Sequence, residues 1–396
     1  MRTFATWRLQ VPEWDGSHRR HGPPHLVAVS ATGGIGGPTK SLLGLLEQYR
    51  GAVRCTLIAP EGHLADTVRR EGLAAEVITI PRWRRAHHVA RILATLRITG
   101  WLLRHRRRVD VIHANGEAEV NLVGPGTVLC GLDLVVSARA SQTRPWVRRT
   151  APLWRRLLPR ARWVAVSTVP RDLVISAGLA EPLRVEVIPN PIDTRQVRAT
   201  ERLESERTRI GYLGGKGFDK GFDLLPDIIR ALGRRDVRWQ LFTSPPSPEA
   251  PRLQHEVWAR LAELQDDGFD IVHHGKLGDV RGAYAACDIV LAPSRRESFG
   301  RIPVEAMANG LPVVASAIPT FAEFFDGTEA GRLFPVGDVV AAATELGALV
   351  EDPTLREQMG EAGHRRARDF APGPLAERFL KIYGFQDHGS PREGEG

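Results

Sequence analysis

Two glutamates, Glu297 and Glu305, stand with seven residues between them in a polar stretch that joins two apolar runs. An ionised carboxylate offers only hydrogen-bond acceptors, so it suits a ligand that carries hydroxyl groups. Glu305 could accept from both hydroxyls of a ribose, and Glu297 could accept from the hydroxyls of a sugar. A second interpretation stays open for Glu305, because a glutamate near the third helical position often caps the N-terminus of its own helix.

The flanking apolar runs, 288–292 and 312–315, predict strands that are buried on both faces of a parallel sheet, with one helix between them. Pro303 suits the first position of that helix, so Glu305 is expected in the first turn. The residues just before the helix then lie where free N–H groups and the helix dipole favour an anion such as a phosphate. Because open α/β sheets bind ligands at the carboxyl ends of their strands, both carboxylates are expected to face one pocket.

A glycine-rich loop lies near the start of the chain, between an expected strand over 26–30 and an expected helix over 40–49. Glycines let a backbone approach a phosphate closely, and the following helix N-terminus adds its dipole. The loop keeps neither the phosphate-loop spacing nor the dinucleotide fingerprint, and a tight turn without a ligand remains an alternative. The candidate phosphate contacts in this loop are Gly33, Gly34, Gly36 and Gly37.

The central stretch resembles the E-x7-E signature of the retaining glycosyltransferases of family 4, which have the GT-B fold. The resemblance is carried by E-S-F-G-R-I-P-V-E-A-M-A-N-G-L-P-V-V-A-S, from Glu297 to Ser316. It implies that Glu297 approaches the donor sugar, that Glu305 binds the nucleotide ribose, and that backbone amides between them hold the diphosphate. The diphosphate contacts implied in this way are Ser298, Phe299, Gly300, Arg301 and Ile302. The glycine-rich loop is similar to one that the family places against the donor phosphates.

Two lysines are predicted to share the stabilisation of the leaving diphosphate. The family pattern has an arginine after the glycine of the second domain's first strand and a lysine further on. Here the arginine position is Gly215, Lys220 keeps the lysine position, and Lys216 could swing into the space of the missing arginine. The alternative is that Lys220 serves alone.

Three further site positions follow from the resemblance. His113 ends an expected buried strand where donor and acceptor groups meet, although it could be only structural. Arg139 stands where the family often carries a histidine that contacts the donor sugar, which leaves that contact open. Lys276 closes a segment, 271–276, that is similar to the strand and loop that contact the nucleotide base.

The length of 396 residues and the alternation of strands and helices predict an α/β protein with two domains. The resemblance implies the GT-B fold, in which two Rossmann-like domains face each other across a donor/acceptor cleft. We expect an N-terminal extension over 1–24, an acceptor domain over 25–198, a nucleotide-sugar donor domain over 199–372, a terminal helix over 373–386 that crosses back to the first domain, and a disordered tail over 387–396.

Positive charge is concentrated in one half of the chain, because residues 1–200 carry a net +15 and the remainder −7. Within the basic half, the region 82–108 mixes arginines with large apolar residues and is interpreted as an amphipathic surface that could rest on anionic lipid. A solvated face over an ordinary core helix is the alternative. Three well-separated cysteines favour a reducing compartment, and neither a transmembrane helix nor a secretory signal is predicted. We therefore expect a cytoplasmic protein that could associate with the inner face of the membrane.

The resemblance implies a retaining glycosyltransferase that moves a sugar from a nucleotide diphosphate sugar to a hydroxyl acceptor, and we expect it to be metal-independent. The expected acceptor is a glycan or a lipid-linked molecule, in the synthesis of a polysaccharide, glycolipid or other glycoconjugate. No cofactor and no metal ion are expected, because the chain contains no D-x-D pair and its cations and helix dipoles could meet the diphosphate charge. Two alternatives stay open: a nucleotide-sugar epimerase of the same architecture, and a non-catalytic basic protein that binds nucleic acid, a partner we do not expect.

Overall fold

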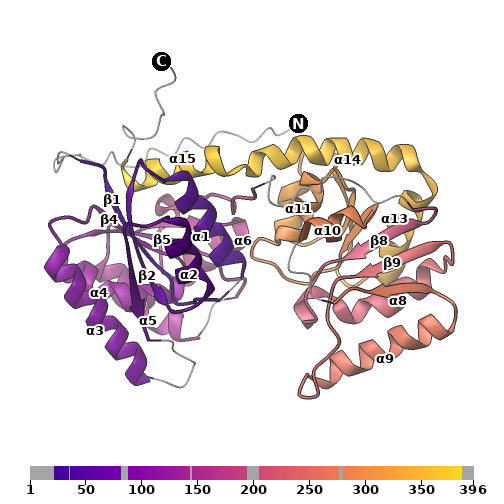
Figure 1. Ribbon diagram of the computed structural model, residues 1–396, viewed down its shortest axis with the longest axis horizontal. Coiled ribbons are helices and arrows are strands. Elements are labelled where there is room, and N and C mark those ends of the chain that lie inside the picture. Colours follow the sequence, from indigo (N-terminus) through magenta and orange to yellow (C-terminus); the bar gives the residue numbers. More distant parts are fainter. Residues whose placement is uncertain are drawn as a thin grey trace, which may run out of the picture. The chain divides into compact units, whose positions relative to one another are not determined.

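The computed structural model describes residues 22–34, 36–81, 88–142, 145–193, 205–275 and 280–385. The chain forms two compact units (Figure 1). The N-terminal unit comprises residues 1–191 together with the terminal segment 372–396, and the C-terminal unit comprises residues 192–371. Each unit has its own parallel sheet and its own buried core.

The sheet of the N-terminal unit has seven strands in the order β3-β2-β1-β4-β5-β6-β7, and every neighbouring pair is parallel. Its strands arise from continuous apolar runs because helices cover both faces of the sheet. The strands are β1 (His25–Val29), β2 (Arg54–Pro60), β3 (Glu76–Ile80), β4 (Val111–Ala114), β5 (Asp133–Ala138), β6 (Arg162–Ala165) and β7 (Val185–Val187).

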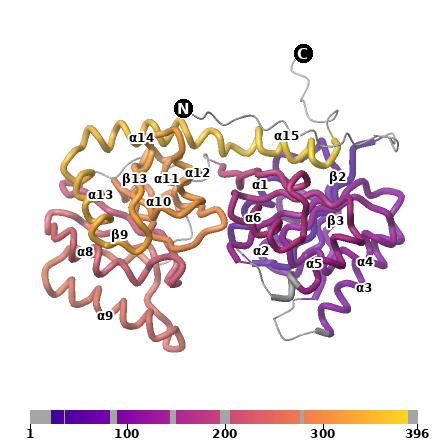
Figure 2. The backbone as a smooth tube through the Cα atoms, turned by 180° about the vertical axis from the view of Figure 1, so that it is seen from behind, coloured from indigo at the N-terminus to yellow at the C-terminus, as the bar shows by residue number. Residues whose placement is uncertain are grey.

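The helices of this unit form two layers, because right-handed crossovers on either side of the switch between β1 and β4 lead to opposite faces. One layer shares a core with the sheet through α1 (Gly37–Gln48), α2 (His63–Glu71) and the terminal helix α15 (Pro372–Tyr383). The other layer consists of α3 (His88–His105), α4 (Val120–Cys130), α5 (Pro145–Leu157) and α6 (Thr168–Ser176). Figures 1 and 2 both show α3, α4 and α5 next to one another.

The sheet of the C-terminal unit has six parallel strands in the order β10-β9-β8-β11-β12-β13, with its switch between β8 and β11. The strands are β8 (Thr208–Tyr212), β9 (Val237–Leu241), β10 (Asp270–His273), β11 (Ile289–Ala292), β12 (Val313–Ser316) and β13 (Gly331–Phe334). Two 3-10 turns, η3 (Phe218–Lys220) and η4 (Phe222–Leu224), follow β8. The helices are α8 (Leu225–Leu232), α9 (Arg252–Asp266), α10 (Val280–Ala285), α11 (Arg301–Ala308), α12 (Pro319–Phe325), α13 (Val339–Glu351) and α14 (Pro353–Ala367).

The strands and helices predicted from the apolar runs are present. The predicted start of the helix after Glu297 is wrong. Helix α11 begins at Arg301 rather than at Pro303, because Gly300 adopts a left-handed backbone with φ of 74° that turns the chain into the helix. Pro303 is then the third helical residue, where its missing N–H still costs no helical hydrogen bond. Glu305 is the fifth residue and lies beyond the first turn.

No helix within the described ranges is long and apolar enough to cross a membrane. All three cysteines are free. The same described residues contain no group of three or more His, Cys, Asp and Glu side chains placed to hold a metal ion. Most of the expected N-terminal extension, the first residues of the basic region and the expected tail lie outside the described residues, as does Lys276.

Candidate active site

A lysine and a glutamate from two neighbouring loops form the centre of the candidate site in the C-terminal unit. Strands β8 and β11 are parallel neighbours, so the loops that follow them meet at the carboxyl edge of the sheet. There Nζ of Lys220 donates to Oε1 of Glu297 over 2.6 Å, and Oγ of Ser294 donates to the same oxygen over 3.1 Å. The Glu297 side chain is 10% exposed and that of Lys220 is 38% exposed, so the lysine keeps an open side toward solvent.

A second set of contacts fixes the two loops to each other. The guanidinium of Arg295 donates to both carboxylate oxygens of Asp223, over 2.6 and 2.8 Å, and lies 3.9 Å over the ring of Phe218. The backbone N–H of Arg295 also donates to the carbonyl of Asp219 over 2.8 Å. Gly221 has φ of 66°, and a Cβ atom there would overlap the carbonyl oxygen of Pro293. The position of Lys220 beside Glu297 therefore depends on a bidentate ion pair and on a glycine.

The loop between the two glutamates is anchored from below and leads into α11. The buried ring of Phe299 lies 5.0 Å from the ring of Phe324, so it holds the loop and does not face a ligand. The N-cap residue Gly300 brings no side-chain oxygen to the first N–H groups of the helix, and a Cβ atom there would lie 2.5 Å from Phe321. This helix end has no side-chain cap from its N-cap residue, and the positive end of the helix dipole favours an anion there.

Glu305 is a fixed acceptor and not a helix cap. Its carboxylate is buried; Oε2 accepts from the hydroxyl of Tyr284 over 2.8 Å, and Oε1 accepts from Nε of Arg301 over 2.9 Å. The capping interpretation is therefore wrong, since the side chain points to these partners from the second turn. Each carboxylate oxygen has two lone pairs, so the two oxygens could still accept from two ligand hydroxyls. Tyr284 gave no signal in the sequence, because nothing in the spacing relates it to Glu305.

Gly215 lies beside Lys220, since a Cβ atom there would be 3.9 Å from Cγ of Lys220, but the ammonium of Lys216 has a different partner. Nζ of Lys216 donates to the carbonyl of Pro245 over 3.0 Å at the surface. The carbonyl of Gly215 accepts from the hydroxyl of Tyr212 over 2.7 Å, which positions the backbone of this loop. The structure therefore places one lysine, Lys220, beside Glu297, and this arrangement favours the alternative in which Lys220 serves alone.

Close packing requires a glycine at one position of the glycine-rich loop in the N-terminal unit. A Cβ atom at Gly33 would lie 2.8 Å from the carbonyl oxygens of Pro60 and Glu61, so only glycine fits against the end of β2. The carbonyl of Gly34 accepts from Oγ1 of Thr39 over 2.8 Å. The loop ends at Gly36, the extended N-cap of α1, and the helix starts at Gly37. As at α11, the glycine N-cap adds no side-chain cap, so this helix end also suits an anion.

Two glutamates that the sequence analysis missed fix the loops around the same sheet edge. Oε1 of Glu117 accepts from the backbone N–H groups of Arg139 and Ala140, over 2.7 and 2.9 Å. Oε1 of Glu119 accepts from the N–H of Ala31 over 2.9 Å, and burial raises the pKa of the Glu119 carboxyl to about 7. Both follow β4 in the segment G-E-A-E, and this pair of carboxylates directly after a buried strand was the available signal.

His113 lies beneath the surface with both ring nitrogens engaged. Nε2 is 2.8 Å from Oγ of Ser137, and Nδ1 is 2.6 Å from the hydroxyl of Tyr383 on α15. Burial, followed by the charge of Arg139, lowers the pKa of His113 to about 3, so the ring is neutral. These contacts support the structural interpretation of His113.

Arg139 is half-buried at the end of β5, and its guanidinium contacts the side chains of Asn190 and Ser41. It lies at the carboxyl edge of the sheet, where its guanidinium bonds protein side chains. The contact of Arg139 with a donor sugar stays a prediction.

Two family models match consecutive parts of the chain. Residues 35–196 match the model described as Glycosyltransferase Family 4, and residues 193–366 match the model described as Glycosyl transferases group 1. Together they extend from the glycine-rich loop to the end of α14.

Curated relatives carry glycosyltransferase names. The D-inositol 3-phosphate glycosyltransferase of Corynebacterium efficiens is 26% identical over 362 residues, which is 86% of this chain and 79% of that protein. A protein of the same name from Kineococcus radiotolerans is 31% identical over 54% of this chain and 45% of its own length. The lipopolysaccharide core biosynthesis mannosyltransferase LpsB of Rhizobium meliloti is 28% identical over 49% of this chain and 56% of its own length. The chain thus spans about half the length of the latter two relatives.

Solved structures show the same fold at low identity. HepE of Anabaena in complex with UDP and glucose has a TM-score of 0.74 at 18% identity, covering 91% of this chain and 99% of that chain. A glycosyltransferase of Rickettsia africae has a TM-score of 0.78 at 16% identity. The match covers 93% of this chain and 100% of that chain. The predicted α/β architecture of two Rossmann-like domains, the GT-B fold, is confirmed.

Proposed function

Because the chain belongs to family 4 of the glycosyltransferases, we propose that it transfers a sugar from a nucleotide diphosphate sugar to a hydroxyl acceptor, with retention of configuration and without a metal ion. The observation that carries this proposal is the contact between Lys220 and Glu297 beside the N-terminus of α11. A cation, a carboxylate and a helix N-terminus lie close together there, and this grouping supports the proposal.

The residues of the C-terminal unit have separate roles in this proposal. Glu305 accepts from the ribose hydroxyls, and the first N–H groups of α11 bind the diphosphate. Glu297 accepts from hydroxyls of the donor sugar. As the bond between the anomeric carbon and the diphosphate oxygen breaks, negative charge grows on the diphosphate, and Lys220 stabilises that charge more in the transition state than in the ground state.

Retention needs no separate protein base. The bond to the acceptor oxygen forms on the face from which the diphosphate departs, and the proton of the acceptor hydroxyl passes to the departing diphosphate oxygen. The ring of His113 in the N-terminal unit is buried and neutral with both nitrogens engaged, which supports leaving it out of this step. Charge on the diphosphate is met by Lys220 and the helix dipoles, which supports a reaction without a metal ion or cofactor.

The donor and acceptor classes are supported by the relatives. HepE is in complex with UDP and glucose, and LpsB is named for mannosyl transfer in lipopolysaccharide core biosynthesis. A nucleotide diphosphate sugar and a glycan or lipid-linked acceptor fit this set. Such an acceptor implies a cytoplasmic protein that works in peripheral contact with the inner face of a membrane. Neither the family models nor these relatives support the epimerase alternative.

The direct test is incubation of the purified protein with a panel of UDP-, GDP- and ADP-linked sugars in the presence of EDTA, with NMR detection of the products. We expect one donor class to release its nucleotide and to give first the sugar anomer of the donor's own configuration. The matched control is Glu297→Gln, which should bind the nucleotide but turn over slowly. Inversion at the anomeric carbon would contradict retention of configuration. Loss of turnover in EDTA would contradict a reaction without a metal ion. Interconversion of donor epimers would establish the epimerase.

A further inference from the structure

Large apolar side chains are exposed on one helical layer of the N-terminal unit. Of the fourteen exposed large apolar side chains among the described residues, nine lie on α3, α4 and α5. Five belong to α3, and two each belong to α4 and α5. On α3, Val89 is 69% exposed, Leu96 is 62% exposed and Ile92 is 57% exposed. We call the exposed residues of these three helices the α3–α5 face.

Helix α3 is apolar on two opposite sides. Its inner side, with Ala94, Ile98 and Leu102, is buried in the core beneath α4. The outer stripe repeats at helical spacing through Val89, Ile92, Leu93 and Leu96, so these side chains share one face. A helix that only covers a core needs one apolar stripe. The second stripe requires another apolar surface to contact.

The charge on the α3–α5 face has a single sign. Three arginines lie in α3 and four in α5, and none of the three helices contains an aspartate or a glutamate. Arg91 and Arg97 are exposed beside the outer stripe of α3. Apolar residues flanked by arginines match the boundary of an anionic bilayer, where acyl chains meet phosphates. A second copy of the same face would bring arginines against arginines, which disfavours self-association. A nucleic acid would pair with the arginines but would leave the apolar stripe unmatched.

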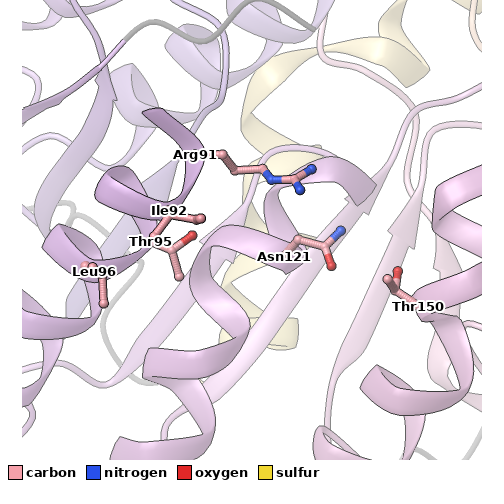
Figure 3. Close-up of a pocket in the computed structure, with 6 residues that line it drawn as sticks. All are labelled: Arg91, Ile92, Thr95, Leu96, Asn121 and Thr150. Carbon is pink, nitrogen blue, oxygen red and sulfur yellow. The ribbon is translucent and has the colours of Figure 1, made fainter. Parts of the chain in front are cut away.

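The face also contains a recess that a flat helix layer would not offer. A cavity of about 360 Å³ lies between α3, α4 and α5 and is lined by Arg91, Ile92, Thr95, Leu96, Asn121 and Thr150. Figure 3 shows the Arg91 side chain reaching from α3 over this hollow toward Asn121 on α4. A guanidinium, hydroxyls and an amide above an apolar wall suit a lipid headgroup phosphate whose acyl chains lie along the stripe.

We propose that the α3–α5 face docks on an anionic lipid leaflet, with the outer stripe of α3 in the headgroup region and Arg91 on a lipid phosphate. The inference rests on the proposed function, because it names the surface through which the enzyme reaches a membrane-proximal acceptor. Docking through α3 buries residues that are remote in sequence from the donor site of the C-terminal unit. Membrane binding and donor chemistry can therefore be measured independently.

The test is flotation of the full chain with vesicles of neutral phosphatidylcholine, or of the same lipid with anionic phosphatidylglycerol. The wild type should float with the anionic vesicles at low salt, and binding should fall as salt rises. Ile92→Glu combined with Leu96→Glu should lower the partition coefficient on the order of tenfold or more. Arg91→Ser should lower it on the order of fivefold. The matched control is Val340→Glu on α13, where the side chain is 70% exposed, and it should float like the wild type.

Several outcomes would overturn the inference. Equal binding to both vesicle types, absence of binding at low salt, or equal losses in Val340→Glu would each do so. An oligonucleotide that binds the wild type and Ile92→Glu/Leu96→Glu equally would reassign the arginines to nucleic acid. Self-association abolished by the same double variant, in sedimentation, would reassign the face to a second copy. Donor turnover without lipid, measured on the same samples, separates the two proposals: turnover without flotation rejects the docking face only, and flotation without turnover rejects the proposed function.

Discussion

The ammonium of Lys220 lies 2.6 Å from Oε1 of Glu297, although 77 residues separate the two in the chain. The contact exists because β8 and β11 are neighbours in the sheet and because Arg295 and Gly221 hold their loops together. Each member keeps the other in position, because a charge-assisted hydrogen bond joins the ammonium to the carboxylate. The following predictions concern this pair and its surroundings.

Lys220→Ala should lower turnover on the order of a hundredfold, about 3 kcal/mol, because it removes the cation that stabilises the leaving diphosphate. Lys216→Ala is the matched control, and its turnover should change less than about twofold, because its ammonium bonds a surface carbonyl. Steady-state kinetics of both variants with one donor make the comparison. Similar losses in the two variants would restore the prediction of two lysines that share the work.

Tyr284→Phe should weaken donor binding by about 1 kcal/mol, because it removes the hydroxyl that fixes Oε2 of Glu305. Glu305→Gln should cost about 2 kcal/mol, since an amide cannot accept from both ribose hydroxyls as a carboxylate does. Calorimetric titration with the nucleoside diphosphate gives both values and that of the double variant. Tyr284 acts through Glu305, so the losses should be less than additive. Full additivity would mean that Tyr284 does not position Glu305.

Gly300→Ala should destabilise the C-terminal unit by at least about 3 kcal/mol, because it adds a collision with Phe321 to the strain of a left-handed backbone. Gly268→Ala is the matched control: its φ is 85°, but a Cβ atom there meets nothing within 4 Å. That variant should cost only about 1 kcal/mol. Urea unfolding of both variants measures the difference. If both variants lose the same free energy of unfolding, the ring of Phe321 does not require a glycine at the start of α11.

Glu119→Gln should change how stability depends on pH. Burial raises the pKa of this carboxyl from 4.5 to about 7, so the folded state holds the proton more tightly than the unfolded state. The stability that protonated Glu119 contributes is present below about pH 4.5 and is lost as the pH rises to about 7. The glutamine variant keeps an acceptor for the N–H of Ala31 and has no charge to bury. Its free energy of unfolding, relative to the wild type, should therefore rise with pH across this window and then level off. A difference that does not change with pH would contradict the raised pKa.

Local pattern in the sequence was sufficient for the strands and for the placement of the main motif. A strand buried on both faces must be a continuous apolar run, and a loop that carries ligand groups at the edge of a parallel sheet must directly follow such a run. The stretch from Glu297 to Ser316 shows both features, so its strand, loop and helix could be predicted from neighbouring residues. The glycine loop before α1 was predictable for the same reason.

Tertiary packing decided which side chains meet. Helix α11 starts at Arg301 because Gly300 turns left-handed beneath Phe321, a contact that the helix-start signal of Pro303 does not contain. The partners of Glu305 and Lys220 come from other elements. Burial keeps His113 neutral, and one of its partners, Tyr383 on α15, is 270 residues away in the chain. Hydrogen-bond partners and burial depend on residues that are distant in the chain, and the period and spacing of a sequence carry information only about near ones.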